Sequence, residues 1–376
     1  MSVTAWSFPT RILFGNGAIR ELGTRAKDFG DSALIVTDEG VVKAGIIDAV
    51  KSSLDAAGVR HATFDGVHPN PYEDDVAAGV EAFKRSGARF IIAVGGGSPL
   101  DVGKLIRLMA THEPPIAQYD DAIGGDAKIV HLVPDMIAVP TTAGTGSEVG
   151  RSGVVTVRAT GRKTVIFAPR LLANLAILDP ELTVGMPART TAATGFDALT
   201  HCLEAYLSRG DHPMADAIAL GGLELAVKHL ATATHDGKNL EARGAMMKSA
   251  AMGAVAFQKG LGACHSLAHP LSSEKHLHHG LANALCLPAV VAFNAETVPE
   301  RVERVAQLFG VGGSELPNAI RKLRKDLGLP DGLRAEGVTE SDLDKLADLA
   351  FIDACHQSNP RPCTRDDLRR LYVQSL

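Results

Sequence analysis

The sequence is poor in aromatic residues, in cysteine and in long apolar runs. Phe, Tyr and Trp make up 5% of 376 residues, and together with 38 glycines this is typical of a soluble α/β protein with many tight turns. The five cysteines are odd in number and form no Cys-x-x-Cys pair, which favours a reducing compartment over a disulfide framework. The chain shows neither a basic amino-terminal segment followed by an apolar stretch nor a run of membrane-spanning length. We therefore expect a cytoplasmic protein without a membrane partner.

Positive charge is not in excess either. The 38 Lys and Arg residues face 43 Asp and Glu residues, which gives a formal net charge of −5. This balance argues against nucleic acid or an anionic membrane as the partner and favours a small molecule. The length exceeds that of most single-core proteins, so we expect two domains.

In the first half of the chain, short β-branched runs alternate with amphipathic stretches. This alternation is typical of a parallel sheet covered by helices. The clearest predicted strands are 33–37, 90–94, 136–139 and 175–178, and the segments 50–58 and 76–87 are predicted helices that end at glycine.

The strand pattern ends near Pro187. Alanine- and leucine-rich segments follow at 190–208, 213–233 and 240–258, and they predict a group of long helices. We therefore predict an α/β dinucleotide-binding domain over 1–185 and an all-helical domain over 186–376.

A glycine-rich turn follows the predicted strand 90–94. It reads Gly-Gly-Gly-Ser-Pro-Leu-Asp from Gly95 to Asp101, and it predicts a helix with Ser98 as N-cap and Pro99 in the first turn. Asp101 is then placed to bond back to the amide of the cap. Glycines let backbone amides approach a ligand, and a helix N-terminus favours phosphate, although such turns also occur without a ligand. The Gly-x-Gly-x-x-Gly spacing of the usual dinucleotide fold is missing.

Three other segments have features of a nucleotide site. The loop 139–149 is rich in hydroxyl groups and small residues, which suits phosphates and nicotinamide, or a plain polar turn. Asp38 follows a predicted strand, where a carboxylate accepts hydrogen bonds from a ribose and repels a 2′-phosphate, so NAD is preferred to NADP. Asn70 lies in the rigid loop 67–71, which either supports the cofactor or only reverses the chain.

Four residues of the second half are candidate metal ligands. Asp197 and His201 are four apart, so a helix places them one above the other, and His265 and His279 follow in a histidine-rich segment. One carboxylate and three imidazoles suit Fe(II) or Zn(II) with positions left open for a substrate oxygen. The alternative is that these histidines are ordinary capping or surface residues.

Taken together, these motifs resemble the iron-containing (group III) alcohol dehydrogenases. The resemblance lies in Gly-Gly-Gly-Ser-Pro-x-Asp, in Pro-Thr-Thr-Ala-Gly-Thr-Gly-Ser-Glu, in the Asp-x-x-x-His pair and in the closing His-x-x-x-His…His-Gly. It covers essentially the whole chain, from Phe14 to Arg361. The family shares its fold with glycerol dehydrogenase and dehydroquinate synthase, so the resemblance implies that fold, an NAD cofactor, iron and at least a homodimer.

The resemblance also implies roles for single residues. Asp197, His201, His265 and His279 match the metal ligands of the family, and His279 is chosen over His278 because it directly precedes Gly280. His269 matches the histidine beside the nicotinamide, which makes it the predicted catalytic residue and a candidate to pass a proton through the cofactor ribose to solvent. The alternative for His269 is to support a metal ligand or to pack. The predicted cofactor-binding residues are Asp38, Asn70, Gly95, Gly96, Gly97, Ser98, Asp101, Thr141, Thr142, Thr145 and Ser147.

The expected reaction is metal-dependent, NAD-linked oxidation of an alcohol or reduction of an aldehyde. Arg151 and Lys259 stand where the motifs depart from the common pattern, and two cations there would hold a carboxylate. The alternative is that both are solvated surface residues or bind cofactor phosphate. This favours an ω-hydroxy acid or its semialdehyde, as in the 4-hydroxybutyrate dehydrogenase branch. Cys355, His356 and Arg361 are further candidate pocket residues. The alternatives are a neutral alcohol or diol (lactaldehyde reductase type), a dehydroquinate synthase-like lyase, a metallohydrolase and a nucleotide sensor.

Overall fold

The computed structural model describes residue 8 and residues 10–376. Residues 1–7 and 9, on which the expectation about the amino terminus partly depends, lie outside the described residues. The described chain divides into an α/β unit, residues 8–142 and 146–185, and a helical unit, residues 186–376 with the short segment Ala143–Thr145. In the part of the chain that the structure covers, no helix is both long and apolar enough to cross a membrane.

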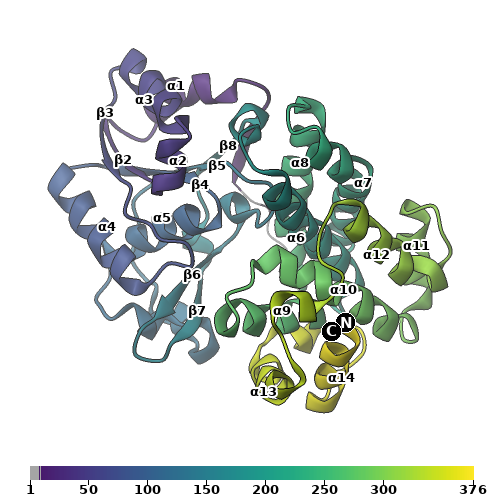
Figure 1. The fold of residues 1–376 in the computed structure, drawn as a ribbon. Coiled ribbons are helices and arrows are strands. Elements are labelled where there is room, and N and C mark those ends of the chain that lie inside the picture. The colour runs from purple at the N-terminus through teal and green to yellow at the C-terminus, as the bar shows by residue number, and fades with distance from the viewer. Residues whose placement is uncertain (1–7, 9) are drawn as a thin grey trace. The chain divides into compact units, whose positions relative to one another are not determined.

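A six-stranded parallel sheet forms the centre of the α/β unit (Figure 1). The spatial order is β1-β8-β5-β4-β2-β3, and every neighbouring pair is parallel. The strands are β1 (Arg11–Phe14), β2 (Ser32–Val36), β3 (Arg60–Phe64), β4 (Phe90–Gly95), β5 (Met136–Pro140) and β8 (Leu175–Leu178). The four predicted strands are β2, β4, β5 and β8.

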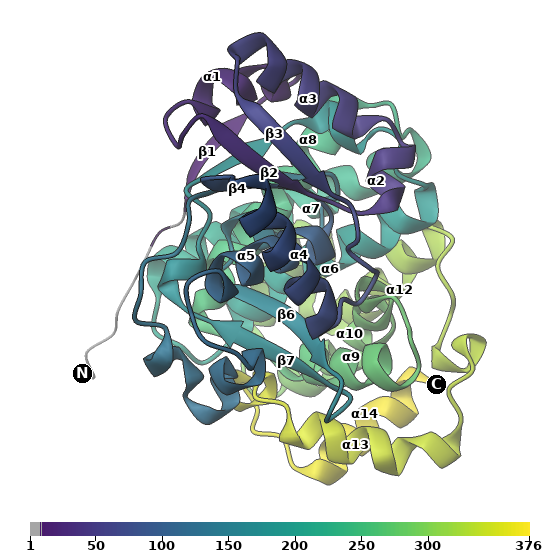
Figure 2. The same ribbon diagram turned by 90° about the vertical axis from the view of Figure 1, so that its left-hand side faces the viewer.

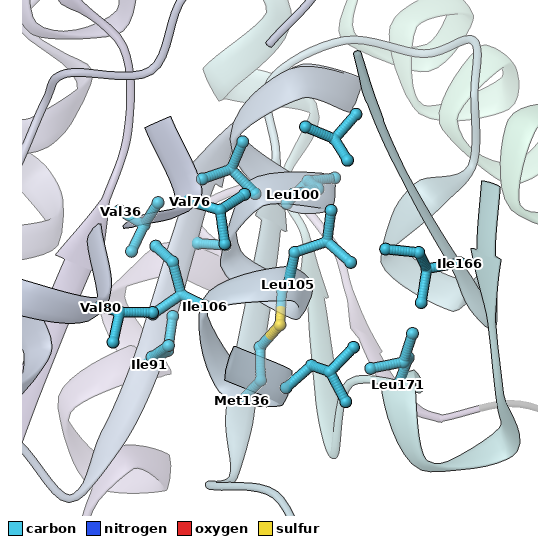
Figure 3. Close-up of a cluster of buried hydrophobic side chains, with 14 of the residues drawn as sticks. Val36, Val76, Val80, Ile91, Leu100, Leu105, Ile106, Met136, Ile166 and Leu171 are labelled. Atoms are coloured by element: carbon cyan, nitrogen blue, oxygen red, sulfur yellow. The ribbon is translucent and has the colours of Figure 1, made fainter. Parts of the chain in front are cut away.

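Side chains alternate between the two faces of this sheet, and both faces are buried. Ile35 and Ile92 point to one face, where they pack against α1 (Leu22–Ala26) and α3 (Ile46–Ala57). Ile91 and Met136 point to the other face, which α4 (Glu73–Ser86) and α5 (Gly97–Met109) cover. Figure 2 shows the helices on either side of the strands, and Figure 3 shows Met136 and Ile91 among the side chains of α4 and α5. Strands buried on both faces explain the continuous apolar runs in the sequence.

A hairpin that the sequence analysis did not predict adds to the α4 and α5 side. Strands β6 (Ser152–Val157) and β7 (Arg162–Phe167) pair in antiparallel fashion. Buried and partly exposed residues alternate along β6, and its buried Val155 belongs to the same apolar cluster as Leu105 of α5. The shorter elements of the unit are α2 (Glu39–Lys43), η1 (Ala18–Glu21), η2 (Ile116–Tyr119), η3 (Asp121–Ile123), η4 (Gly125–Lys128), η5 (Ser147–Val149), η6 (Pro169–Leu171) and η7 (Pro180–Thr183).

Every regular element described after Thr183 is a helix. The predicted helices at 190–208, 213–233 and 240–258 correspond to the first three of the unit, and α3 and α4 end, as predicted, at the left-handed glycines Gly58 and Gly87. The helices are α6 (Ala188–Leu207), α7 (Pro213–His235), α8 (Leu240–Ala256), η8 (Phe257–Lys259), α9 (Ala263–Glu274), α10 (His279–Ala295), α11 (Pro299–Leu308), η9 (Gly313–Glu315), α12 (Leu316–Asp326), η10 (Leu333–Glu336), η11 (Glu340–Asp342), α13 (Leu343–Ile352), η12 (Cys355–Ser358) and α14 (Arg365–Ser375). The predicted fold class is confirmed.

Candidate metal centre and cofactor loops

Helix α6 presents three potential ligand or anchor groups on one face. Asp197, His201 and Glu204 are spaced by four and three residues, so they lie one above the other along the helix. All three side chains are buried. Because a carboxylate is costly to bury without a partner, their burial indicates that polar groups from other helices meet them.

Helices α9 and α10 supply those partners. The Asp197 Oδ1 atom lies 3.9 Å from His201 Nε2, 3.9 Å from His265 Nε2 of α9 and 3.5 Å from His279 Nε2 of α10. The rings of His201 and His265 stack with their centroids 4.6 Å apart. Three helices thus bring the four predicted ligands together, and the cluster contains His279 rather than the exposed His278.

Burial and charge set the protonation of this cluster. Burial favours a protonated Asp197, but the three histidines outweigh it and lower the pKa of Asp197 to about 2. Burial lowers the pKa of His201 to about 4 and that of His279 well below its usual value, although Asp197 opposes both shifts. At neutral pH these shifts favour an ionised Asp197 carboxylate and neutral His201 and His279 rings, which is the state in which these three residues bind a metal.

Asn283 of α10 shows that the centre of the cluster favours positive charge. Its Nδ2 group donates to Asp197 Oδ1 at 2.9 Å and lies 3.3–3.4 Å from the Nε2 atoms of His265 and His279. Ligand atoms held by one ion at about 2.1 Å lie roughly 3.0–3.4 Å apart, so the observed 3.5–3.9 Å separations need to contract by less than about 1 Å. The residues present fit a divalent ion of the Fe(II) or Zn(II) type.

Glu204 orients one of the candidate ligands. Its Oε2 atom lies 2.6 Å from His265 Nδ1, and its Oε1 atom accepts the Cys264 amide at 2.6 Å. Burial lowers the pKa of His265, but the Glu204 carboxylate, aided by Asp197, outweighs this effect and raises it. A carboxylate on the far nitrogen fixes the ring and leaves Nε2 to bind metal. Sequence reasoning missed Glu204 and Asn283, although Glu204 continues the helical spacing of Asp197 and His201, and Asn283 lies four residues after His279.

Two glycines set how closely the helices approach at this cluster. A Cβ atom at Gly280 would lie 2.0 Å from the Ala193 carbonyl oxygen of α6. A Cβ atom at Gly253 of α8 would lie 2.9 Å from His201 Cβ. Only glycine allows these backbone approaches, so the positions of His201 and His279 depend on residues without a functional group.

His269 follows His265 by one turn of α9 and is more exposed. Its ring stacks on that of His279 with centroids 5.2 Å apart, and its Nδ1 atom lies 2.7 Å from Asp353 Oδ2. Potential ligand atoms of His269, Asp353 and Cys355 all lie within 4.8 Å of one another. Two of the predicted functional residues, His269 and Cys355, are thus neighbours beside the cluster.

The predicted phosphate and ribose contacts lie at the carboxyl ends of neighbouring strands. Strand β2 leads to β3 on one side of the sheet, whereas β4 leads to β5 on the other. The loops after β2 and β4 therefore diverge, and such a switch point is where α/β sheets bind nucleotides. Asp38 follows β2, Gly95–Ser98 end β4 and begin α5, and Thr141 and Thr142 follow β5, with the Thr141 amide bonded to the Gly95 carbonyl at 2.9 Å.

The predicted cap of α5 is wrong in detail. The helix begins at Gly97 with Gly96 as N-cap, and no side chain caps it. Asp101 does not bond back to a cap; its carboxylate accepts from Ser147 Oγ at 2.6 Å and from the Val154 amide at 3.2 Å. The glycine backbone alone can begin this helix, so Asp101 is available to hold the hairpin. Because these hydrogen bonds occupy the Asp101 carboxylate, we do not propose it as a cofactor contact.

The remaining predicted cofactor residues lie in different places. Asp38 caps α2 by accepting the Val41 amide at 2.9 Å. Asn70 has a φ of 53° and accepts from Lys163 Nζ at 2.8 Å. Ser147 accepts from Lys104 Nζ at 2.7 Å, whereas Thr145 groups with the helical unit.

Glu148 is a buried acid next to this network. It lies in η5 and is 3% exposed. Burial raises its pKa to about 7, although its own backbone amide and Lys104 act in the opposite direction. Sequence reasoning assigned it no role.

The predicted substrate residues do not form one set. Lys259 is buried, and its ammonium group donates to the Tyr206 carbonyl at 2.9 Å and to the Asp216 carboxylate, so it is engaged in a structural ion pair and we remove it from the substrate site. Arg361 likewise binds Glu296 at 2.8 Å. The amide of His356 donates to Ser266 Oγ at 2.8 Å and its ring stacks on Phe351, which indicates packing.

Arg151 remains a candidate in the α/β unit. It precedes β6, and its guanidinium carbon lies 5.0 Å from the centre of the Phe167 ring. It is half-buried, and burial lowers its pKa. A half-buried cation resting on an aromatic face keeps a fixed position and loses part of its hydration, which suits the binding of an anion.

Comparisons with known proteins identify the family of the chain. Residues 9–180 match the family model described as iron-containing alcohol dehydrogenase, and residues 191–376 match that described as Fe-containing alcohol dehydrogenase family, C-terminal. The chain is 42% identical over 379 residues to 4-hydroxybutyrate dehydrogenase of Cupriavidus necator, with 98% of each chain covered.

Solved structures give the same result. A 1,3-propanediol oxidoreductase is 38% identical with a TM-score of 0.96, and all of both chains is covered. Sulfoacetaldehyde reductase of Bifidobacterium kashiwanohense, solved in complex with NAD+, is 29% identical with a TM-score of 0.90, covering 100% of this chain and 99% of that one. The predicted family and enzyme class are therefore confirmed: the chain belongs to the iron-containing alcohol dehydrogenase family and is an oxidoreductase.

Proposed function

We propose that this enzyme is an iron-dependent, NAD(H)-linked dehydrogenase of a short ω-hydroxy acid, or a reductase of the corresponding semialdehyde. The observation that carries the reaction type is the meeting of Asp197, His201, His265 and His279 around one point, with His269 beside them. Asn283 supports a cation at that point, because its amide group is the hydrogen-bond donor among acceptors.

The roles of the chain's own residues follow from their positions. Asp197, His201, His265 and His279 would hold the ion, and Glu204 keeps His265 in the binding orientation. A bound divalent ion polarises a substrate oxygen and makes the alcohol a stronger acid. His269, half-exposed beside the cluster, takes up the proton as the alcohol is oxidised and returns it in the reverse direction.

The α/β unit would bind the nicotinamide cofactor. Gly95–Ser98 at the N-terminus of α5 offer backbone amides to a pyrophosphate, and Asp38 at the end of β2 offers a carboxylate to a ribose. The NAD+ complex of sulfoacetaldehyde reductase supports NAD as the cofactor. We also propose a cytoplasmic homodimer or larger assembly, which light scattering of the purified protein tests.

The anionic substrate is the finer part of the proposal. The names 4-hydroxybutyrate dehydrogenase and sulfoacetaldehyde reductase both denote substrates with an acid group, and Arg151 is a fixed, half-buried cation. The 1,3-propanediol oxidoreductase favours the alternative, a neutral alcohol or diol.

Arg151→Met tests this choice. We expect the KM for succinic semialdehyde to rise at least about tenfold, because a charged hydrogen bond contributes about 1.5–3 kcal/mol, whereas the KM for lactaldehyde stays unchanged. The assay follows NADH oxidation by anaerobic, Fe(II)-loaded enzyme, with metal-stripped protein as the blank. Arg158→Met is the matched control, since Arg158 lies in the same hairpin over the Tyr72 ring at 4.3 Å and pairs with Asp74.

Three outcomes would contradict parts of the proposal. Wild-type turnover of lactaldehyde that equals or exceeds that of succinic semialdehyde rules out the hydroxy acid and leaves the dehydrogenase. An equal rise in both KM values shows that Arg151 acts on the fold or the cofactor. If neither aldehyde supports NADH oxidation, the enzyme is not a dehydrogenase of these substrates, and the lyase alternative is favoured.

A further inference from the structure

Helix α9 presents two histidines that are each bonded to a carboxylate through Nδ1. His265 lies 2.6 Å from Glu204, and His269 lies 2.7 Å from Asp353. The first pair belongs to the metal cluster. The second pair joins residues 84 positions apart in the chain and does not include a residue of the Asp197 cluster.

Asp353 is held in place on both oxygens. Its Oδ1 atom accepts from Ser266 Oγ at 2.7 Å and from the Cys355 amide at 2.9 Å, while its Oδ2 atom faces His269 Nδ1. Ser266 is fixed in turn by the His356 amide at 2.8 Å. The segment after α13 is thus bonded to α9, and the carboxylate cannot turn without breaking several hydrogen bonds.

We propose that Asp353 is the positioning residue of the proton-transfer step: it keeps the hydrogen of His269 on Nδ1, and Nε2 is therefore the nitrogen that exchanges a proton with the substrate or the cofactor ribose. An ionised carboxylate only accepts hydrogen bonds, so the ring must donate to it through Nδ1. The proposal rests on the proposed function for the reaction, but the location of the ring hydrogen can be measured without turnover.

A second metal site is the competing interpretation, because the ligand atoms of His269, Asp353 and Cys355 lie within 4.8 Å of one another. Two observations oppose it. Both Asp353 oxygens already accept hydrogen bonds from protein donors. Burial, together with Asp353, raises the pKa of the Cys355 thiol well above its usual value, which disfavours the thiolate that a metal requires.

The substitution Asp353→Asn is a sharp test of the proposal, because the hydrogen-bond donors around this side chain determine the orientation of the asparagine amide. Two donors, the Ser266 hydroxyl and the Cys355 amide, meet at the Oδ1 position, so the asparagine oxygen takes that place. Its NH2 group then faces His269 Nδ1 and forces that nitrogen to accept. The hydrogen moves to Nε2, which no longer has a lone pair to offer. Every hydrogen bond remains satisfied, so the fold is preserved.

The first readout needs no substrate. Long-range proton–nitrogen correlation spectra of isotope-labelled histidines in the Zn(II)-loaded enzyme show which ring nitrogen of His269 carries hydrogen, with His269→Gln used for assignment. We expect Nδ1 in the wild type and Nε2 in Asp353→Asn. Hydrogen on Nε2 in the wild type overturns the proposal. Binding of a second zinc ion that Asp353→Asn and Cys355→Ser both abolish overturns it in favour of the metal interpretation.

The second readout is kinetic. With Fe(II) and NADH, Asp353→Asn should lower kcat by about 100-fold or more while KM and metal content stay near wild type, in line with the loss of a general acid or base. In a His269→Gln background the same change should have little further effect, since Asp353 acts through His269. Asp348→Asn, the same change at an exposed position of α13 paired with Arg365, is the control. A kcat of Asp353→Asn within threefold of wild type would disprove the positioning role but not the dehydrogenase activity. An inactive wild type would disprove the dehydrogenase activity, and the spectra alone would then decide the tautomer of His269.

Discussion

The two histidine–carboxylate pairs of α9 have nearly the same geometry but differ in exposure. The side chains of His265 and Glu204 are each 2% exposed, whereas those of His269 and Asp353 are 38% and 21% exposed. A pair sealed from water cannot exchange protons quickly with solvent, so it suits a permanent ligand. A pair open to water suits proton transfer. For the roles proposed for His265 and His269, the two pairs differ in burial more than in hydrogen-bond geometry.

The largest expected effect comes from a change in the buried metal cluster. Asp197→Ala removes the carboxylate to which all three imidazoles lie close, and we expect the bound metal to fall to background and NADH oxidation to fall at least about 1,000-fold, which corresponds to about 4 kcal/mol of transition-state stabilisation. Metal analysis of the purified variant and the aldehyde assay measure the two effects. Full metal content in this variant would show that the four residues do not form the site.

A weaker effect is expected when the carboxylate of the buried His265–Glu204 pair is changed. Glu204→Gln removes the charge that fixes His265, and loss of such a carboxylate typically lowers metal affinity about 10–100-fold. Competition with a chelator measures the affinity, and kcat at saturating Fe(II) should stay within a few-fold of wild type. If Glu204→Gln instead lowered kcat at full metal occupancy, the assignment of metal binding to the His265–Glu204 pair and of proton transfer to the His269–Asp353 pair would be wrong.

The smallest effect on turnover concerns a buried carboxyl group that interacts with a lysine, and here the expected change is in stability. Glu148 has a pKa near 7 in the folded protein against 4.5 as the ordinary value. Because the folded pKa is the higher one, its contribution to stability is complete below pH 4.5 and is lost as the pH rises through 7, by about 3 kcal/mol.

Glu148→Gln should therefore flatten the decline in stability across this pH window and raise the unfolding midpoint at pH 8, with kcat unchanged. Denaturant unfolding of the metal-loaded protein at several pH values tests this expectation, with the exposed Glu81→Gln as control. An unfolding midpoint at pH 8 equal to or below that of the wild type would show that the buried carboxyl group is stabilised by contacts that burial does not reveal.

Local patterns explain what the sequence could predict. The apolar runs of β2, β4, β5 and β8, the glycine ends of α3 and α4 and the Asp197–His201 spacing are all short-range features, and each appears in the structure. Glu204 and Asn283 were within reach of the same helical reasoning. The hairpin β6–β7 was missed because its buried positions alternate with partly exposed ones, which gives no continuous apolar run.

Long-range partners explain what the sequence could not predict. Nothing near Asp353 in the chain indicates that it meets a histidine 84 positions earlier. Lys259 looked like a substrate contact because a lysine stood in an unusual place, but its partner Asp216 is 43 positions away. Ser98 looked like a cap because it precedes a proline, but the helix begins earlier at Gly97. For Asp353 and Lys259 the decisive contact comes from another element.

The close approach of α6, α8 and α10 has a consequence for how this enzyme tolerates change. Gly280 and Gly253 bear no chemical group, but a single methyl at either one would displace the backbone that carries His279, or press on the Cβ of His201. Random mutagenesis should therefore find loss-of-metal variants at positions that an inventory of reactive side chains leaves out. A redesign of the substrate range of the enzyme should therefore keep these two glycines, because a side chain at either position does not fit between the helices.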